Sequence, residues 1–222
     1  MEIRILRADD QRSEFRSSDP DLDRFFHKYA GQNQFRHYLG VTYVAVQTRR
    51  VLGYATISPG SVEIDSIPAA LKRKAPSYPM PVLRLARLTV DERSQGQGVG
   101  KQLVRFVFNL AIKMADMYGC IGVVVDAKPA AVEFYASLGF ASLEVIEGAS
   151  DARPPPTVMF LPMKAIVGAV GKQVVGNAAR SIAGRTASGG TQGAGMLLVA
   201  GCSLLENDRQ FAKSCSGVQE LG

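Results

Sequence analysis

A glycine-rich turn between residues 93 and 101 is the part of this sequence best suited to chemistry. It reads Arg-Ser-Gln-Gly-Gln-Gly-Val-Gly-Lys, with glycines at positions 96, 98 and 100. Glycine has no Cβ, so successive backbone N–H groups of such a turn can converge on an anion. A helical pattern begins directly behind the turn, and a helix N-terminus attracts negative charge to the same point. The pattern predicts a pyrophosphate cradle, with Lys101 adding a positive charge nearby.

Two better-known phosphate-binding loops do not fit this turn. A Walker loop requires Ser or Thr after its Gly-Lys pair, and here the next residue is Gln102. A dinucleotide-binding fingerprint requires G-x-G-x-x-G near the start of a βαβ unit. The glycines here are spaced G-x-G-x-G, and the turn begins only after residue 90.

The elements on either side of the turn must hold it in place. Residues 82–90 alternate strictly, which predicts a strand with Val82, Arg84, Ala86, Leu88 and Val90 on one face. A long amphipathic helix is expected after the turn. Its predicted core stripe is Leu103, Val104, Val107, Leu110, Ala111 and Met114.

The remaining sequence alternates between strand and helix patterns. A helix is expected from Pro20, with Asp19 as its cap and Leu22, Phe25, Phe26 and Tyr29 on one apolar face. Other expected helices cover residues 67–75, which are basic, and 129–139. Strands are expected at 2–7, on either side of a turn at 47–50, at 121–126, at 140–145 and at 157–163. This order predicts an α/β or α+β sheet domain.

Composition separates a core-forming region from an extension. Residues 166–222 contain eleven of the 22 glycines and a single aromatic residue, Phe211. Aromatic side chains supply much of a buried core, so we expect a domain at 1–164. Residues 165–222 are expected to form a flexible or weakly helical Gly/Ala-rich extension.

The composition also excludes several protein classes. No apolar run reaches the ~18–20 residues of a membrane span, and the acidic N-terminal residues do not suit a targeting peptide. Three scattered cysteines fit neither a disulfide framework nor a metal site. We therefore expect a cytoplasmic protein that binds no metal and no membrane.

Positive charge is concentrated between Arg24 and Val90. This segment holds ten basic and two acidic residues, a net charge of +8. It is either an ordinary solvated surface or a surface for a polyanion, since Lys and Arg gain affinity by releasing phosphate counterions. The residues we single out as candidate RNA contacts are Lys28, Arg36, Lys72, Arg73, Lys74 and Arg87.

Two motifs of this sequence resemble those of a known family. Arg93-x-x-Gly96-x-Gly98 matches the Q/R-x-x-G-x-G/A motif of the GNAT acetyltransferases, which cradle the pyrophosphate of acetyl-coenzyme A. Residues 131–140 are similar to the family's A-x-x-F-Y-x-x-x-G-F element. The resemblance covers residues 2 to about 164, and it implies a mixed central sheet that is splayed at the coenzyme site and flanked by helices.

The first half of the chain resembles the GNAT toxins of bacterial toxin–antitoxin pairs. The matching segments are 21–26, Tyr43-Val44, Gly53-Tyr54 and 87–91. This resemblance implies acetylation of the amino group of aminoacyl-tRNA, a block of translation, and neutralisation by a ribbon-helix-helix antitoxin. We also expect a homodimer. The alternatives are an acetyltransferase for a small amine or a protein N-terminus, and a non-catalytic protein that binds RNA or antitoxin.

The resemblance also assigns roles to residues. Tyr135 corresponds to the tyrosine that protonates the thiolate leaving group, and a phenol is protonated at neutral pH; it could instead be a packing residue. Acetyl transfer passes through an oxyanion that needs positioned donors, which in this family are backbone N–H groups. The expected coenzyme-binding residues are Leu88, Thr89, Val90, Arg93, Gln95, Gly96, Gln97, Gly98, Val99, Gly100 and Lys101.

Two points stay open in the sequence. No spacing singles out a general base among Asp126, Glu133, His27 and His37. Many GNAT proteins have Asn before their last helix, whereas this chain has Lys128-Pro129. The departure puts the amide contact to the pantetheine arm in question, but not the cradle.

Overall fold

The computed structural model describes residues 1–63, 78–143 and 156–171. All of them belong to the first of two units, which spans Met1–Arg180; the second spans Ser181–Gly222. The basic helix expected at 67–75, most of the extension from residue 165, and the strand expected at 140–145 beyond residue 143 lie outside the described residues. Residues 163–171 are helical, and Ile166 is buried in the core. The predicted boundary after residue 164 stays a prediction.

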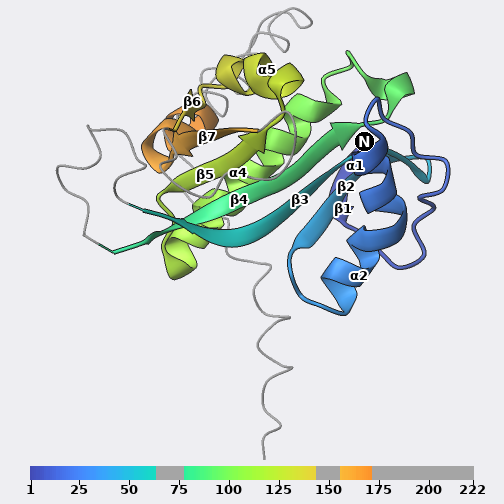
Figure 1. Ribbon diagram of the computed structural model, residues 1–222, viewed down its shortest axis with the longest axis horizontal. Helices are drawn as coiled ribbons and strands as arrows, with labels where there is room; N and C mark the ends of the chain where they lie inside the picture. Colours follow the sequence, from blue (N-terminus) through green and yellow to red (C-terminus); the bar gives the residue numbers. More distant parts are fainter. Residues whose placement is uncertain (64–77, 144–155, 172–222) are drawn as a thin grey trace, which may run out of the picture. The chain divides into compact units, whose positions relative to one another are not determined.

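A mixed sheet of seven strands runs through the described chain in the order β1-β2-β3-β4-β5-β7-β6 (Figure 1). β4 and β5 are parallel, and the other neighbouring strands are antiparallel. The strands are β1 (Glu2–Ile5), β2 (Val41–Gln47), β3 (Arg50–Val62), β4 (Met80–Val90), β5 (Gly122–Ala127), β6 (Ala141–Ser142) and β7 (Thr157–Pro162). This sheet confirms the predicted class.

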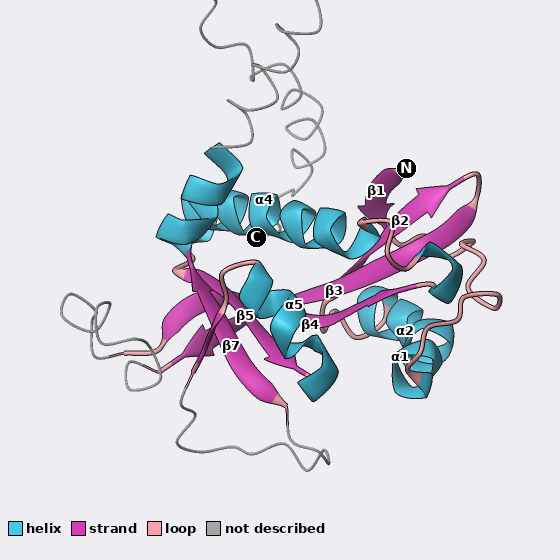
Figure 2. Ribbon diagram, turned by 90° about the horizontal axis from the view of Figure 1, so that it is seen from above, coloured by secondary structure: helices cyan, strands magenta, loops and turns pink. Residues whose placement is uncertain are grey.

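Helices lie on both sides of the sheet, with α4 on one side and α1 and α2 on the other (Figure 2). They are α1 (Pro20–Arg24), the π-helical η1 (Phe25–Tyr29), α2 (Ala30–Phe35), the 3-10 turn η3 (Glu92–Ser94), α4 (Val99–Tyr118), the 3-10 turn η4 (Pro129–Ala131) and α5 (Val132–Ser137). None of the helices among the described residues is long and apolar enough to cross a membrane.

Each face of the sheet carries its own hydrophobic core. On the α4 face, Leu103, Val104, Val107 and Ala111 of the predicted stripe are fully buried against β3, β4 and β5. Leu110 and Met114 are partly buried there. On the other face a second cluster packs the helical run 20–35 against β2 and β3.

The N-terminal helical run begins as predicted. Asp19 caps it, because its carboxylate accepts hydrogen bonds from the amides of Asp21 and Leu22. Phe25 and Phe26 are buried, but Tyr29 is 46% exposed, so the predicted four-residue apolar face is wrong at its end. The amide of Ala30 donates to the carbonyl of Phe25, which is an i→i+5 bond. This wider π turn rotates Tyr29 away from the core.

The strict alternation predicted for residues 82–90 is wrong. Thr56 pairs with Arg87 and Ile57 pairs with Leu85, so Ala86 is an extra residue in β4. Such a bulge reverses the alternation of side chains beyond it. Leu83 and Leu85 therefore share the α4 face with Leu88 and Val90, and Arg84 and Arg87 share the opposite face.

Candidate active site

The glycine-rich turn has the backbone conformation that the sequence predicted. Gly96 and Gly98 have φ values of +74° and +79°, a region that residues with a side chain rarely adopt. A Cβ added at either position would meet no protein atom within 4 Å, so the space in front of both glycines is open. Gly98 is also the N-cap of α4. The turn therefore presents bare backbone to an open region.

The first amides of α4 point into the same region without intrahelical partners. The first helical bond runs from the amide of Gln102 to the carbonyl of Gly98, at 3.1 Å. The amides of Val99, Gly100 and Lys101 therefore have no carbonyl within the helix. Together with the helix dipole they suit the charge and size of a pyrophosphate. Acetyl-coenzyme A, which carries such a group, fits this donor set.

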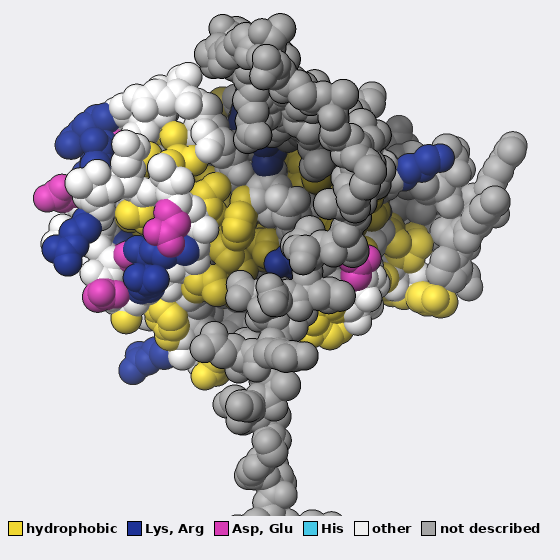
Figure 3. Space-filling model, turned by 180° about the vertical axis from the view of Figure 1, so that it is seen from behind, with side chains coloured by type: hydrophobic (Ala, Val, Ile, Leu, Met, Phe, Trp, Pro, Cys, Tyr) yellow, Lys and Arg dark blue, Asp and Glu magenta, His cyan; other side chains and the backbone are white. Residues whose placement is uncertain are grey.

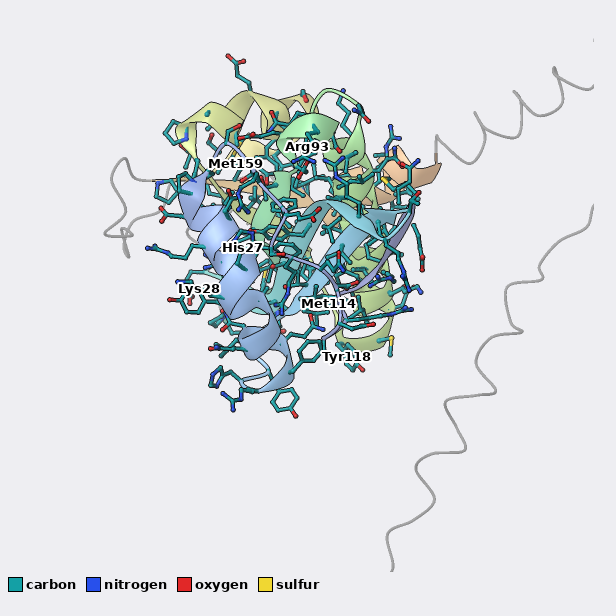
Figure 4. The ribbon with its side chains drawn as sticks, turned by 90° about the vertical axis from the view of Figure 1, so that its right-hand side faces the viewer. His27, Lys28, Arg93, Met114, Tyr118 and Met159 are labelled. Carbon is teal, nitrogen blue, oxygen red and sulfur yellow. The ribbon has the colours of Figure 1, made fainter. Side chains whose placement is uncertain are left out.

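The side chains of the turn brace it from the outside. Gln97 donates to the carbonyl of Arg93 at 3.0 Å, and Gln95 donates to Ser18 Oγ and to the carbonyl of Val90, both at 3.3 Å. Arg93 and Lys101 are exposed. Arg93 lies at the end of the molecule where α4 begins, and Tyr118 lies at the opposite end of that helix (Figure 4). Both cations are thus exposed at the end of α4 that carries the turn.

Asp91 anchors this turn, a role that the sequence alone did not assign to it. Its carboxylate is 2% exposed and accepts from the Arg50 guanidinium and from the amides of Arg93 and Arg16 at 3.2 and 3.4 Å. Its own amide donates to the carbonyl of Leu52 at 2.8 Å. One buried carboxylate therefore ties the turn to β3 and to the N-terminal loop. An aspartate directly between a strand and a turn is a common capping signal and could have identified it.

β4 and β5 separate next to the turn. Their register pairs only Leu83, Arg84 and Leu85 of β4 with Val123, Val124 and Val125 of β5. Beyond these pairs, within the described residues, β5 continues to Ala127 with β7 as its neighbour, while Arg87 to Val90 remain paired with β3. Among the residues that the structure describes, the edge of β4 that faces β5 is thus unpaired along Leu88, Thr89 and Val90. This is the splay that the family resemblance implied, with backbone groups available to a ligand.

Tyr135 lies in α5, beside this separation. Its side chain is 4% exposed and makes edge-on ring contacts with Phe134 and Phe140, with centroids 5.1 and 5.5 Å apart. Burial raises the pKa of the Tyr135 phenol well above its ordinary value, so the hydroxyl stays protonated at neutral pH. A Cβ at Gly100 would lie 3.6 Å from Phe134 and 3.5 Å from Val90. α5 therefore packs against the start of α4 and the end of β4.

Lys128, which stands where many GNAT proteins have Asn, has a partner in the N-terminal region. Its Nζ donates to Oδ2 of Asp19, the cap of α1. Burial raises the pKa of Asp19, but the hydrogen bond from Lys128 and those from backbone amides lower it. Together these effects leave the pKa of Asp19 below its ordinary value. The contact links the segment after β5 to the start of α1.

The four general-base candidates occupy different environments. His27 is half-buried, and its Nε2 lies 2.9 Å from the Phe15 carbonyl, so it has a structural partner. His37 and Glu133 are exposed. Asp126 lies on β5 at the separation and pairs with Arg84 across it, at 3.2 Å. Among the described residues no group of His, Cys, Asp and Glu could hold a metal ion.

The candidate RNA contacts are only partly visible. Lys28 and Arg36 are exposed on the helical run 20–35, and the Lys28 side chain points away from the sheet (Figure 4). Arg87 is half-buried on the same side of the sheet, and Lys72 to Lys74 lie outside the described residues. Seen from the α4 side, the described basic side chains form separate groups with acidic ones beside several of them (Figure 3).

Comparisons with known proteins agree with this geometry. A model of the acetyltransferase (GNAT) domain matches residues 39–142. A tRNA-acetylating toxin of Mycobacterium tuberculosis is 35% identical over 140 residues, which cover 62% of this chain and 81% of that protein. AtaT complexed with acetyl-methionyl-tRNAfMet has a TM-score of 0.66 at 28% identity, covering 74% of this chain and 96% of AtaT. An AtaT mutant toxin bound to the C-terminus of the antitoxin AtaR and acetyl-CoA has a TM-score of 0.60 at 28% identity, covering 75% and 95%.

Proposed function

The chain belongs to the GNAT acetyltransferase family, and we propose that it moves the acetyl group of acetyl-coenzyme A to the amino group of an aminoacyl-tRNA. As a member of that family it is an acetyl-coenzyme A-dependent N-acetyltransferase. Acetylation of the amino group would remove the nucleophile that forms the next peptide bond. The proposed outcome is a block of translation, which is the activity of a toxin.

The observation that carries this proposal is the separation of β4 from β5 directly beside the glycine-rich turn. The turn and the first amides of α4 would hold the pyrophosphate. The unpaired edge of β4 along Leu88, Thr89 and Val90 would donate to the acetyl oxygen, where negative charge develops. When bound, acetyl-coenzyme A supplies an activated thioester. Tyr135, which is protonated at neutral pH, would give its proton to the departing sulfur.

Substrate and partners are proposed from the relatives and from charge. The Mycobacterium tuberculosis relative is a tRNA-acetylating toxin, and AtaT is seen with an acetylated aminoacyl-tRNA. The concentration of Lys and Arg between Arg24 and Val90 suits a nucleic acid of that size. An antitoxin is proposed as the protein partner, as for AtaT and AtaR, with a ribbon-helix-helix fold. A homodimer and a cytoplasmic location, where charged tRNA is found, complete the proposal.

A transfer assay tests this function. Purified protein is incubated with labelled acetyl-coenzyme A and with charged tRNA, the same tRNA uncharged, and free amino acids or peptides. Label is expected on charged tRNA only, because the uncharged tRNA ends in hydroxyl groups and lacks the α-amino group of an attached amino acid. Transfer to peptides or free amines instead of charged tRNA would overturn the proposed substrate. Coenzyme binding without transfer to any acceptor would overturn the enzymatic function.

A further inference from the structure

Asp126 and Arg84 form an ion pair at the point where β4 and β5 separate. Arg84 lies in the last paired stretch of β4, and Asp126 is the first residue of β5 beyond its last pair with β4. Arg84 Nη2 lies 3.2 Å from Oδ2 and 3.3 Å from Oδ1 of Asp126. The side chains are 38% and 33% exposed, so the pair is accessible from solvent. It therefore marks the apex of the opening.

The carboxylate of Asp126 lies on the opposite face of the sheet from Tyr135. Val125 and Ala127, its neighbours in β5, belong to the core cluster on the α4 face, which also contains Tyr135. Because side chains alternate along a strand, Asp126 points to the other face. On that face α1 and α2 lie over the N-terminal strands, and no described helix lies in front of β5 (Figure 1). Asp126 therefore faces the side of the sheet opposite to Tyr135, and its side chain is 33% exposed there.

We propose that Asp126 is the catalytic base, which takes the proton of the acceptor amine on the face of the sheet opposite to Tyr135. The inference rests on the proposed function. The two proton transfers of the reaction would then be served from opposite faces of the separated strands. Arg84 would hold the carboxylate at the apex, as a positioning residue.

The step balances with the groups already named. The amine nitrogen forms a bond to the acetyl carbon, and the bond from that carbon to sulfur breaks. The proton lost by the nitrogen goes to the Asp126 carboxylate, and the departing thiolate takes a proton from the Tyr135 hydroxyl. Exchange with solvent returns both side chains to their starting states. No further oxidant, reductant or co-reactant is needed.

Other charged groups near this face would influence the pH dependence of the reaction. On β4 they are Arg84 and Arg87. Lys128 follows β5 and pairs with Asp19 at the cap of α1. β7 places the uncharged Val158 opposite Asp126. Asp126 is the one acidic residue of β5 (Gly122–Ala127), and the charged side chains named above are all basic except Asp19.

The first test compares Asp126→Asn with wild type and with Asp116→Asn, a matched removal of an exposed carboxylate on α4. General base catalysis is typically worth ~10²–10⁴-fold, so we expect kcat of Asp126→Asn to fall by about that factor while Asp116→Asn stays unchanged. The Tm and the Kd for acetyl-coenzyme A should match wild type in both variants. Added formate should restore part of the rate of Asp126→Ala. A kcat of Asp126→Asn within about threefold of wild type between about pH 6 and 9 would overturn the proposal.

A binding measurement tests the same residue without turnover. An RNA minihelix that ends in an amide-linked amino acid is compared with its N-acetylated form. Wild type is expected to prefer the free amine, and Asp126→Asn is expected to lose that preference while it retains affinity for the RNA. An unchanged preference in Asp126→Asn would overturn the assignment. Wild type that acetylates no charged tRNA would overturn the proposed function instead, and the binding comparison would then decide the role of Asp126 by itself.

Discussion

The guanidinium of Arg87 lies 3.8 Å above the centre of the Phe25 ring. Phe25 belongs to the buried cluster beneath the N-terminal helical run, and its ring lies 6.2 Å from that of Tyr54. The extra residue at position 86 places Arg87 on this face of β4. Arg87 therefore connects the strand that leads to the active site with the helix above it, and this contact occupies a side chain that the sequence suggested for RNA binding.

Replacing Arg87 should affect both stability and RNA binding. A cation over an aromatic ring contributes about 0.5–2 kcal/mol, so Arg87→Met should lower the free energy of unfolding in urea by about that amount. Arg36→Met removes an exposed cation and should leave unfolding unchanged. Both variants should weaken tRNA binding in a filter assay if both cations contact phosphate. Equal stability of the two variants would contradict the role assigned to the Phe25 contact.

Tyr135→Phe should fold normally and bind acetyl-coenzyme A with unchanged affinity. The change removes one hydroxyl and keeps the ring contacts with Phe134 and Phe140. Loss of a general acid costs ~10²–10⁴-fold, so kcat in the transfer assay should fall by about that factor. A reduced Tm with nearly normal turnover would instead mean that Tyr135 is a packing residue.

Substitutions at Gly98 separate backbone strain from charge. Gly98→Ala places a methyl group at φ +79°, at a cost of about 1–2 kcal/mol, but the methyl meets no protein atom within 4 Å. Gly98→Asp has the same strain and adds a negative charge where the pyrophosphate would bind. We expect calorimetry to show a moderately weakened Kd for acetyl-coenzyme A in the first variant and no detectable binding in the second. Equal affinities would remove the cradle assignment.

Gly122→Ala should be among the most damaging small changes. A Cβ at Gly122 would overlap the Leu161 carbonyl oxygen and lie 2.6 Å from Phe160 Cε2. Overpacking of this kind costs about 1–3 kcal/mol, and occasionally more. The matched variant Gly60→Ala meets only ordinary contacts, with Val82 Cγ2 at 3.5 Å. The Tm measured by thermal denaturation should therefore be lowered far more by Gly122→Ala than by Gly60→Ala.

The ion pair of Arg4 and Asp10 should make stability depend on acid pH. A hydrogen bond from Arg4 lowers the pKa of Asp10 below its ordinary value, and the two charged groups lie 2.6 Å apart. A lowered folded-state pKa adds stability above the unfolded pKa, which is about 4. That stability is lost as the pH falls through the folded pKa. Asp10→Asn should therefore be less stable than wild type in urea at neutral pH, and the difference should shrink in strong acid. A constant difference at both pH values would contradict the prediction.

Local signals were sufficient to predict most of the helices and strands that the structure describes, and the glycine-rich turn. Gly96 and Gly98 stand where a left-handed backbone is required, and Asp19-Pro20 is a helix start that needs no tertiary information. The tight turn at 47–50 was also predicted, although Thr48 and Arg49 adopt positive φ values of 49° and 68° without being glycine. These features depend on the conformations of a few neighbouring residues.

Features that depend on distant partners were not predictable in the same way. The extra residue at Ala86 arises from pairing with β3, so the alternating pattern of β4 gave the wrong faces. Asp126 could not be distinguished from Glu133 or His27 until its contact with Arg84, 42 residues earlier, was known. Asp91 anchors the turn through hydrogen bonds from the Arg50 guanidinium and the Arg16 amide, and both donors lie in other segments of the chain.

The extra residue in β4 acts on the strand as a one-letter insertion acts on a reading frame. Deleting Ala86 would cancel the insertion and restore strict alternation, with Leu88 and Val90 still on the α4 face and Arg87 still on the Phe25 side. Deleting Leu88 would instead turn Val90 toward the Phe25 side, because Leu88 is a paired residue of the strand and its loss shifts the alternation beyond it. We therefore expect natural variants with a shorter strand to lack the residue at position 86.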